Sequence, residues 1–270
     1  LNGSVYRSTG GNDFGDIRQC SGIRDIYSSR LAKKFPASFS GVRAIVNTPS
    51  GRTEKICRRL LEGRNDREGF PVVFHISGDG RKISAYTDET GYVAQDKLIM
   101  LGCMDEFEQG RDAALPFSFP RAADVLAERY GRRVLRFAYC SDGSDSEARS
   151  LAADGNFMGD GIHLMLKVTA LMSRKGMTLK ELCGSLPGFA AVSRYVAVDS
   201  PRSRSIAVMR RLGGDTAGND GVMIDRNGCR VIVRPVKTGR GVMMFAEGFD
   251  IEAASELCDD IQERIKKLCD

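Results

Sequence analysis

A strand–helix–strand unit near the start of the chain constrains the fold most strongly. The short apolar runs Val42–Val46 and Pro71–Ile76 are typical of buried strands, and the pattern of Thr53–Leu61 between them predicts a helix. Two strands joined through such a helix pair in parallel, because an antiparallel pair needs only a short turn. The unit therefore predicts an α/β fold with a parallel strand pair.

A second unit of the same kind follows. The runs Ala114–Ser118 and Arg133–Ala138 are predicted to be strands, and Arg121–Tyr130 between them is predicted to be a helix that ends at Gly131. The expected fold class is α/β, with mixed α/β sandwich units followed by a small C-terminal α+β domain.

Helical periodicity predicts further helices. Ile23–Phe35 is expected to bury one apolar face, with Ser21 as the candidate cap. That face holds Ile23, Ile26, Tyr27, Leu31 and Phe35. The other predicted helices are Gln95–Met104, Ile162–Lys175, Leu179–Ser185, Ile206–Leu212 and Ile251–Leu268. Ser141–Gly161 is predicted to be a loop and Asp199–Ser205 a linker, because both are polar and rich in turn-forming residues.

The stretch from Val231 to Glu247 predicts a β-hairpin with a basic loop. Apolar and β-branched residues flank Gly239 and Gly241, and glycine adopts positive φ more readily than any other residue. The candidate phosphate-binding residues are Arg234, Lys237, Thr238, Gly239 and Arg240. Cations, a hydroxyl and glycines that let a ligand approach the backbone suit an anion. The alternative is a hairpin whose charges are only solvated.

Composition narrows the class of protein. The 270 residues carry a net charge of +5, with 42% hydrophobic and 28% charged residues, as is usual for globular proteins. The basic surplus is spread along the chain without an aromatic stacking platform, so nucleic acid is not expected as a partner. No apolar run approaches the ~18 residues of a membrane span and no signal peptide is recognised, so no membrane partner and a cytoplasmic localisation are expected.

The residues most often found in metal and catalytic sites give no clear pattern. The eight cysteines stand singly without a C-x-x-C, which favours reduced, buried thiols over a zinc site. Neither His75 nor His163 has a Ser, Cys or carboxylate partner that the sequence places nearby. Each histidine is therefore expected to pack or to lie on the surface rather than to act as a base.

Several motifs, in order, resemble those of the α-D-phosphohexomutase superfamily, the phosphoglucomutases and phosphomannomutases. Arg234–Arg240 resembles the superfamily's phosphate loop, approximately R-P-S-G-T-E-P, ahead of a strand and a final helix. Asp160–Leu166 looks like its D-G-I-L-A-x-L helix and Leu179–Pro187 like its L-S-E-L-x-x-x-L-P segment. Arg121–Gly131 is similar to the helix of the third domain, and Val42–Gly51 resembles V-V-V-D-T-x-x-G of the second.

The resemblance implies four domains around a cleft. A phosphoserine of the first domain exchanges its phosphoryl group with a hexose phosphate, while Mg²⁺ held by three aspartates of a D-G-D-G-D-R loop neutralises charge. A third-domain G-E-[EM]-S-G loop holds the sugar hydroxyls, and the fourth-domain loop holds the phosphate that does not react.

This chain departs from that pattern. No T-A-S-H-N phosphoserine motif occurs, and Ser4 and Ser8 stand in no equivalent context. The metal loop aligns with Ser77–Arg81, in which Asp79, beside Arg81, is the remaining acid. Asp79 is thus the metal candidate, although a hard cation needs several oxygen ligands, so no cofactor is assigned and Mg²⁺ is expected only from the resemblance.

Two further segments lack sequence that the family pattern contains. The region from Ser141 to Met158 contains no G-E-x-S-G, and less sequence than the family spacing implies lies between Leu61 and Phe70. The resemblance then divides the chain into a shortened second α/β domain (1–88), a third α/β domain (89–198) and a C-terminal α+β phosphate-loop domain (206–270).

The expected function is that of a divergent or partial phosphohexomutase of carbohydrate metabolism. It is expected to bind a hexose phosphate without catalysing phosphoryl transfer by itself, and no catalytic residue is assigned. The alternative is a pseudoenzyme that acts as a protein-interaction or sugar-phosphate-sensing module, with a protein as its partner.

Overall fold

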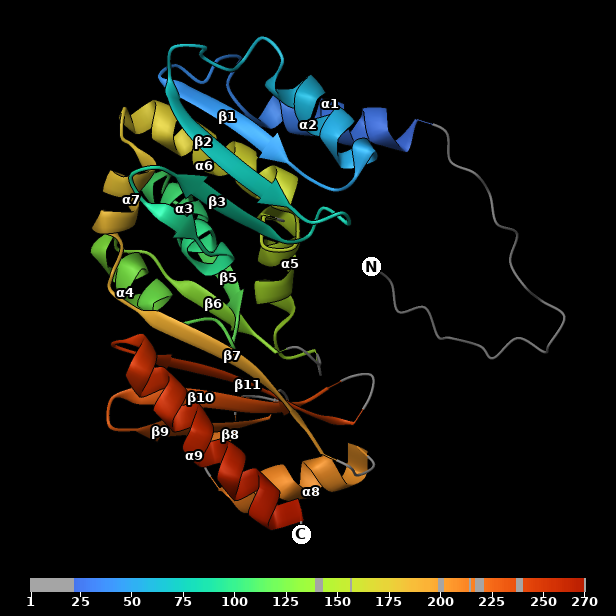
Figure 1. The fold of residues 1–270 in the computed structure, drawn as a ribbon, viewed down its shortest axis with the longest axis vertical. Helices are drawn as coiled ribbons and strands as arrows, with labels where there is room; N and C mark the ends of the chain where they lie inside the picture. Colours follow the sequence, from blue (N-terminus) through green and yellow to red (C-terminus); the bar gives the residue numbers. More distant parts are fainter. Residues whose placement is uncertain are drawn as a thin grey trace, which may run out of the picture.

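The computed structural model describes residues 22–138, 143–155, 157–198, 202–213, 215–216, 221–236 and 240–269. Their strands form three sheets, two in the larger part of the molecule and one in the C-terminal part (Figure 1). The helices are α1 Ile23–Lys34, α2 Gly51–Leu61, α3 Gln95–Glu108, α4 Ala122–Arg129, α5 Ser146–Gly155, α6 Gly161–Lys175, α7 Leu179–Ser185, α8 Arg202–Leu212 and α9 Ile251–Cys269. The strands are β1 Val42–Asn47, β2 Phe70–Ile76, β3 Ile83–Thr87, β4 Gly91–Val93, β5 Ala113–Pro116, β6 Val134–Phe137, β7 Ala190–Ala197, β8 Asp215–Thr216, β9 Val222–Arg226, β10 Cys229–Pro235 and β11 Gly241–Gly248.

The first sheet has the order β1-β2-β3-β4. Strands β1 and β2 are parallel and connected through α2, which confirms the first strand–helix–strand unit, whereas β3 and β4 add antiparallel hairpins. One face is buried under α3 and α6, and Figure 1 shows α6 behind the strands. On β2, Val72, Phe74 and Ile76 point into that core, and the residues between them are more exposed. Helix α6 is buried on nearly all sides because the sheet and α3 enclose it.

The second sheet is the parallel pair β5-β6, whose connection runs through α4 as the sequence predicts. A single hydrophobic core, reaching from Leu31 to Leu182, joins these elements to the first sheet. The predicted loop over Ser141–Gly161 is wrong in part, because α5 occupies Ser146–Gly155 and packs on β5. The aspartate, serine and glycine content suggested a loop, but Ala148 of α5 is buried against the sheet.

The C-terminal sheet has the order β7-β11-β10-β9-β8 and is antiparallel throughout. Helices α8 and α9 pack on it around a core of its own, which reaches from Val196 to Ile265. Arg121 at the start of α4 links this sheet to the rest of the molecule, with ion pairs of 2.6 Å to Glu247 and 3.0 Å to Asp225.

Three local expectations are wrong. Ile23 and Ile26 of α1 are 60% and 68% exposed, so the helix does not bury the whole predicted face. Its cap position is Gly22, not Ser21. Part of the predicted linker Asp199–Ser205 is helical, because α8 begins at Arg202.

Two further observations concern the cysteines and the apolar character of the helices. Among the described residues, Cys57, Cys103, Cys183, Cys229 and Cys258 are free thiols, in agreement with the expectation of reduced cysteines. In the part of the chain that the structure describes, no helix combines the length and the apolar character needed to cross a bilayer.

Candidate functional site

The ends of several strands bring the predicted site segments toward one side of the molecule. The turn that follows β2 and the ends of β10 and β11 beside their loop lie at the right of the view in Figure 1. Ligands of α/β proteins are usually bound outside the carboxyl ends of parallel strands, where loops leave the sheet. The candidate site segments therefore share this side of the molecule.

The turn Ser77–Lys82, which contains the metal candidate Asp79, is closed by its own hydrogen bonds. The Ser77 hydroxyl donates to Asp79 Oδ1 at 2.5 Å, and the Arg81 N–H donates to the same oxygen at 3.1 Å. These bonds, the Ser77 hydroxyl first, lower the pKa of Asp79. The carboxylate is thus used to shape the turn.

The residues present do not fit a magnesium site of the kind that the resemblance implies. Such an ion takes about six oxygen ligands, and a protein usually supplies one or two carboxylates along with other oxygens. The described residues contain no group of three or more His, Cys, Asp or Glu side chains that would hold a metal ion. Asp79 is the acid of its turn and already accepts two hydrogen bonds.

Helix α6 holds this turn through the Asp160-Gly161 pair. Gly161 N–H donates to Gly80 O at 2.7 Å, and a Cβ at Gly161 would lie 3.0 Å from Gly80 O and 3.2 Å from Lys82 O. Asp160 caps the helix by accepting from His163 N–H at 2.9 Å. This gives the D-G-I motif a physical reason, since the aspartate begins the helix and the glycine lets the turn approach.

Tyr27 of α1 fixes Asp160 in turn. Its hydroxyl donates to both carboxylate oxygens of Asp160, at 2.8 and 2.9 Å. Burial, followed by the charge of Asp160, raises the pKa of Tyr27. The helical pattern puts Tyr27 on a packing face and gives no sign of this bond, because 133 residues separate the two partners.

The candidate phosphate loop lies between β10 and β11. Arg234 pairs with Met243 across the two strands, and its guanidinium lies 4.7 Å from the centre of the Phe245 ring. Arg240 is at the other end of the loop, directly before Gly241. The remaining predicted residues, Lys237, Thr238 and Gly239, lie outside the described residues.

Tyr195 of β7 anchors the end of this loop, and sequence analysis did not identify it. Its hydroxyl donates to Arg240 O at 2.5 Å. Gly241 has φ 147°, and a Cβ there would lie 2.5 Å from Val196 O and 2.8 Å from the Tyr195 ring, so only glycine fits. The missed signal was the alternation of Ala190–Ala197, which forms β7 beside β11.

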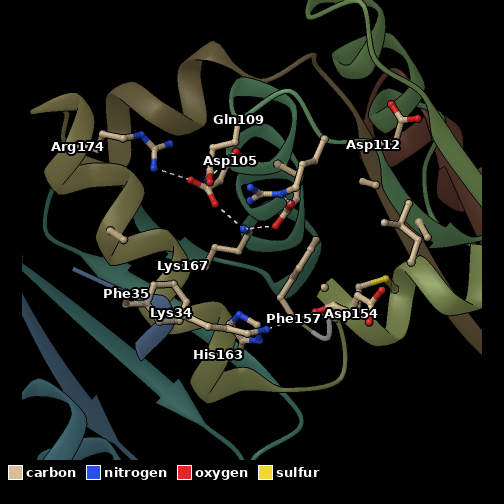
Figure 2. Close-up of a pocket in the computed structure, with 18 of the residues that line it drawn as sticks. Lys34, Phe35, Asp105, Gln109, Asp112, Asp154, Phe157, His163, Lys167 and Arg174 are labelled. Carbon is tan, nitrogen blue, oxygen red and sulfur yellow. Dashed lines mark hydrogen bonds and ion pairs between the residues drawn. The ribbon is translucent and has the colours of Figure 1, made fainter. Parts of the chain in front are cut away.

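A separate cavity of about 690 Å³ lies between α3, α5, α6 and the end of α1, and Figure 2 shows its lining. At its base, Lys167 forms ion pairs with Asp105 and Glu106, and Arg174 pairs with Asp105 at 2.7 Å. These charges neutralise one another and join α3 to α6, with Lys167 and Asp105 buried and Arg174 at the surface. This network was not predicted from the sequence, although α3 ends in acids and α6 carries the matching bases.

The two histidines differ in their surroundings. His163 lines the cavity in Figure 2, is 5% exposed, and meets the Phe35 ring edge to face at a centroid distance of 5.4 Å. Burial lowers the pKa of His163 to about 4, so its imidazole is neutral near pH 7. His75 is exposed on β2. Each histidine was expected to pack or to lie on the surface, and the structure places His163 in the interior and His75 on the surface.

Comparison with known proteins gives sequence relatives, although no family model matches the chain. A phosphoglucosamine mutase of Carboxydothermus hydrogenoformans is 22% identical over 96% of this chain and 68% of its own length. A phosphoglucosamine mutase of Desulfotalea psychrophila is 23% identical over 77% of this chain and 49% of its own. The chain thus spans about half to two thirds of the length of these curated relatives.

Solved structures share the fold. A phosphoglucomutase/phosphomannomutase family protein of Burkholderia thailandensis superposes with a TM-score of 0.67 at 14% identity, over 91% of this chain and 64% of that one. An N-acetylphosphoglucosamine mutase of Aspergillus fumigatus, in complex with GlcNAc-6P and magnesium, superposes with a TM-score of 0.59 at 12% identity, over 91% of this chain and 64% of that one. An N-acetylglucosamine-phosphate mutase of the α-D-phosphohexomutase superfamily superposes with a TM-score of 0.60 at 13% identity, over 92% of this chain and 66% of that one.

Proposed function

From the α-D-phosphohexomutase fold of this sugar-phosphate-mutase-like chain, we propose that it binds a hexose phosphate at the loop between β10 and β11. The observation that carries the proposal is the anchored loop end: Tyr195 holds the Arg240 carbonyl at 2.5 Å and Gly241 lets β7 approach. An anchored loop end keeps the backbone of Arg240 in place, which lowers the entropy cost of binding an anion there.

Charge supports a phosphate as the group that the loop binds. Arg234 and Arg240 stand at the two ends of the loop, and Lys237 lies between them in the sequence. A planar guanidinium offers paired N–H donors to phosphate oxygens, and the Phe245 ring restricts the orientation of Arg234. A relative of the same fold was solved with GlcNAc-6P, a hexosamine phosphate.

We further propose that this chain by itself does not transfer the phosphoryl group. The support is the Ser77–Lys82 turn, whose single carboxylate is bonded within the turn and does not fit a magnesium ion. Binding without phosphoryl transfer is also expected of a pseudoenzyme that senses a sugar phosphate or binds a protein partner. Such a pseudoenzyme is the second candidate function.

The division into units 1–88, 89–198 and 206–270 belongs to this proposal. The separate core of the C-terminal sheet supports a distinct C-terminal unit, but β7 pairs with β11 and Val196 lies in that core, so this unit begins before residue 198. The first two units share one core, which supports a shortened second domain packed on the third.

Thermal unfolding tests the binding proposal. A ligand that binds only the folded protein stabilises it by about 1.4 kcal/mol at ten times its Kd, so glucosamine 6-phosphate should raise Tm in a concentration-dependent way. Inorganic phosphate should compete, and glucosamine should not stabilise. An unchanged Tm at millimolar sugar phosphate would contradict the proposal. In a separate assay with magnesium and a hexose bisphosphate activator, measurable mutase turnover that Arg234→Ala abolishes would contradict the proposed lack of transfer.

A further inference from the structure

The cavity between α3, α5, α6 and the end of α1 has a size that suits a small molecule. Its volume of about 690 Å³ falls in the range of roughly 300–1,000 Å³ that is usual for ligand pockets. The exposed residues Lys34, Arg111 and Asp154 belong to its lining, so the cavity opens to solvent on that side. It is separate from the loop between β10 and β11, which belongs to another sheet.

Aromatic rings form part of the cavity wall. The Phe157 ring packs directly on α3, because a Cβ at Gly102 would lie 3.0 Å from it, and Lys167 Nζ lies 5.4 Å from its centre. The Phe35 ring, just after α1, stands edge-on to the His163 ring. Other apolar residues of the wall are Leu151, Ala152 and Ala170.

His163 supplies a polar group in this wall, and Figure 2 shows its ring below Lys167. The residue is 5% exposed and, within the described part of the chain, its backbone N–H is bonded but its ring makes no hydrogen bond to protein. The neutral imidazole has one ring nitrogen that donates a hydrogen bond and one that accepts. A buried polar group without a partner costs free energy, and a ligand in the cavity would supply that partner.

The charges of the lining favour an uncharged ligand. Basic and acidic side chains are equal in number, four of each. Lys167 and Arg174 both pair with Asp105. Lys167 and Arg111 both pair with Glu106. Charges that already neutralise one another attract neither an anion nor a cation strongly.

We propose that this cavity binds an uncharged, planar heteroaromatic molecule of two fused rings, the class of indole and the purine bases. The apolar faces of such a molecule match the rings of Phe35 and Phe157, and its ring nitrogen matches the imidazole of His163. An apolar cavity of about 150 Å³ is enough for benzene, so the larger volume here has room for a second ring. A sugar is a poorer match, because its hydroxyls would lie against the apolar wall without partners.

Indole is the first probe, because the chain contains no tryptophan and the fluorescence of indole can be followed without that background. We expect its emission to move to shorter wavelength when protein is added. In isotope-labelled protein, indole and adenine should shift the backbone amide signals of Ala152 and Ala170, which line the cavity. Glucose, a polyol, and benzoate, a charged aromatic molecule, should leave these signals unchanged.

A filled cavity should not bind the probe. Ala152→Phe places a ring in the cavity and should abolish indole binding. Ala153 is the next residue of α5, is exposed and does not belong to the lining, so Ala153→Phe is the matched control and should bind indole as the wild type does.

His163→Phe tests the hydrogen bond apart from the cavity. It keeps an aromatic ring in place and removes one neutral hydrogen bond, so indole binding should weaken about three- to tenfold. Binding of toluene, which forms no such bond, should be unchanged. The exposed His75, changed to Phe in the same way, should affect neither probe.

Three results would overturn the proposal. The first is that millimolar indole and adenine leave the signals of Ala152 and Ala170 unshifted. The second is that glucose or benzoate binds more tightly than indole. The third is that Ala152→Phe binds indole as the wild type does, or that His163→Phe weakens toluene as much as indole.

Discussion

The Asn65 side chain bonds Ala44 as a neighbouring strand would, accepting from its N–H at 3.0 Å and donating to its C=O at 2.8 Å. Next to this contact, Asp66 N–H donates to Val42 O at 3.1 Å. The short segment between α2 and β2 thus seals the free edge of β1. An edge protected in this way is a feature of a sheet that ends at β1.

Asn65→Ala should destabilise the protein by about 1 kcal/mol, since two hydrogen bonds are lost and water replaces part of them at this edge. It should also promote self-association through the unpaired edge of β1. Urea unfolding and light scattering measure the two effects. Asn65→Asp keeps the acceptor for Ala44 N–H and loses the donor, so an intermediate effect is expected; equal stability of all three proteins would contradict the role assigned to Asn65.

Lys167→Met should be destabilising, by up to about 3–5 kcal/mol, because it removes the buried cation that Asp105 and Glu106 share. The carboxylates then keep only the more exposed Arg174 and Arg111. Lys175→Met on the same helix is the matched control. Lys175 is 30% exposed and pairs with Glu108 at 2.6 Å, so its loss should cost about 1 kcal/mol or less. Denaturant unfolding compares the two, and similar costs would show that burial of the Lys167 network contributes little.

The buried His163 predicts a loss of stability in mild acid. Its pKa is about 4 in the folded protein, below the ordinary value near 6.5, so the unfolded chain binds the extra proton. Stability from this residue is therefore complete above about pH 6.5 and is lost as the pH falls toward 4, by up to about 3 kcal/mol. His163→Gln should flatten this part of the stability profile. The exposed His75, changed to Gln in the same way, is the control for the substitution itself.

Much of the fold could be predicted from local sequence patterns, whereas the contacts of the candidate site could be predicted less well. The parallel pairs β1-β2 and β5-β6 were predicted because a helix between two apolar runs leaves few alternatives. Strand β7 was missed because its residues Ala190–Ala197 carry only a weak alternation of buried and exposed positions. Tyr195 and Tyr27 were missed as anchors because their partners lie 45 and 133 residues away, and such pairs depend on the tertiary fold.

Gly161→Ala should disturb the turn that carries Asp79. The added methyl group would lie 3.0 Å from Gly80 O and 3.2 Å from Lys82 O, both backbone atoms, so a cost of about 1–3 kcal/mol is expected. Gly184→Ala in α7 meets nothing within 4 Å and should stabilise slightly, because alanine favours helix. If Gly161→Ala is as stable as the wild type, the close contact between α6 and the turn is not a constraint.

The most direct test of the central claim is calorimetric titration of glucosamine 6-phosphate into the wild type, Arg234→Ala and Arg226→Ala. Arg226 lies at the opposite end of β9 and β10, paired with Asp260 at 2.6 Å, and is the matched arginine control. A charge-assisted contact to phosphate is worth about 1.5–3 kcal/mol, so Arg234→Ala should weaken binding by about 10- to 150-fold. Arg226→Ala should bind as the wild type does. Equal affinity of all three proteins, or no binding by any of them, would contradict a phosphate site between β10 and β11.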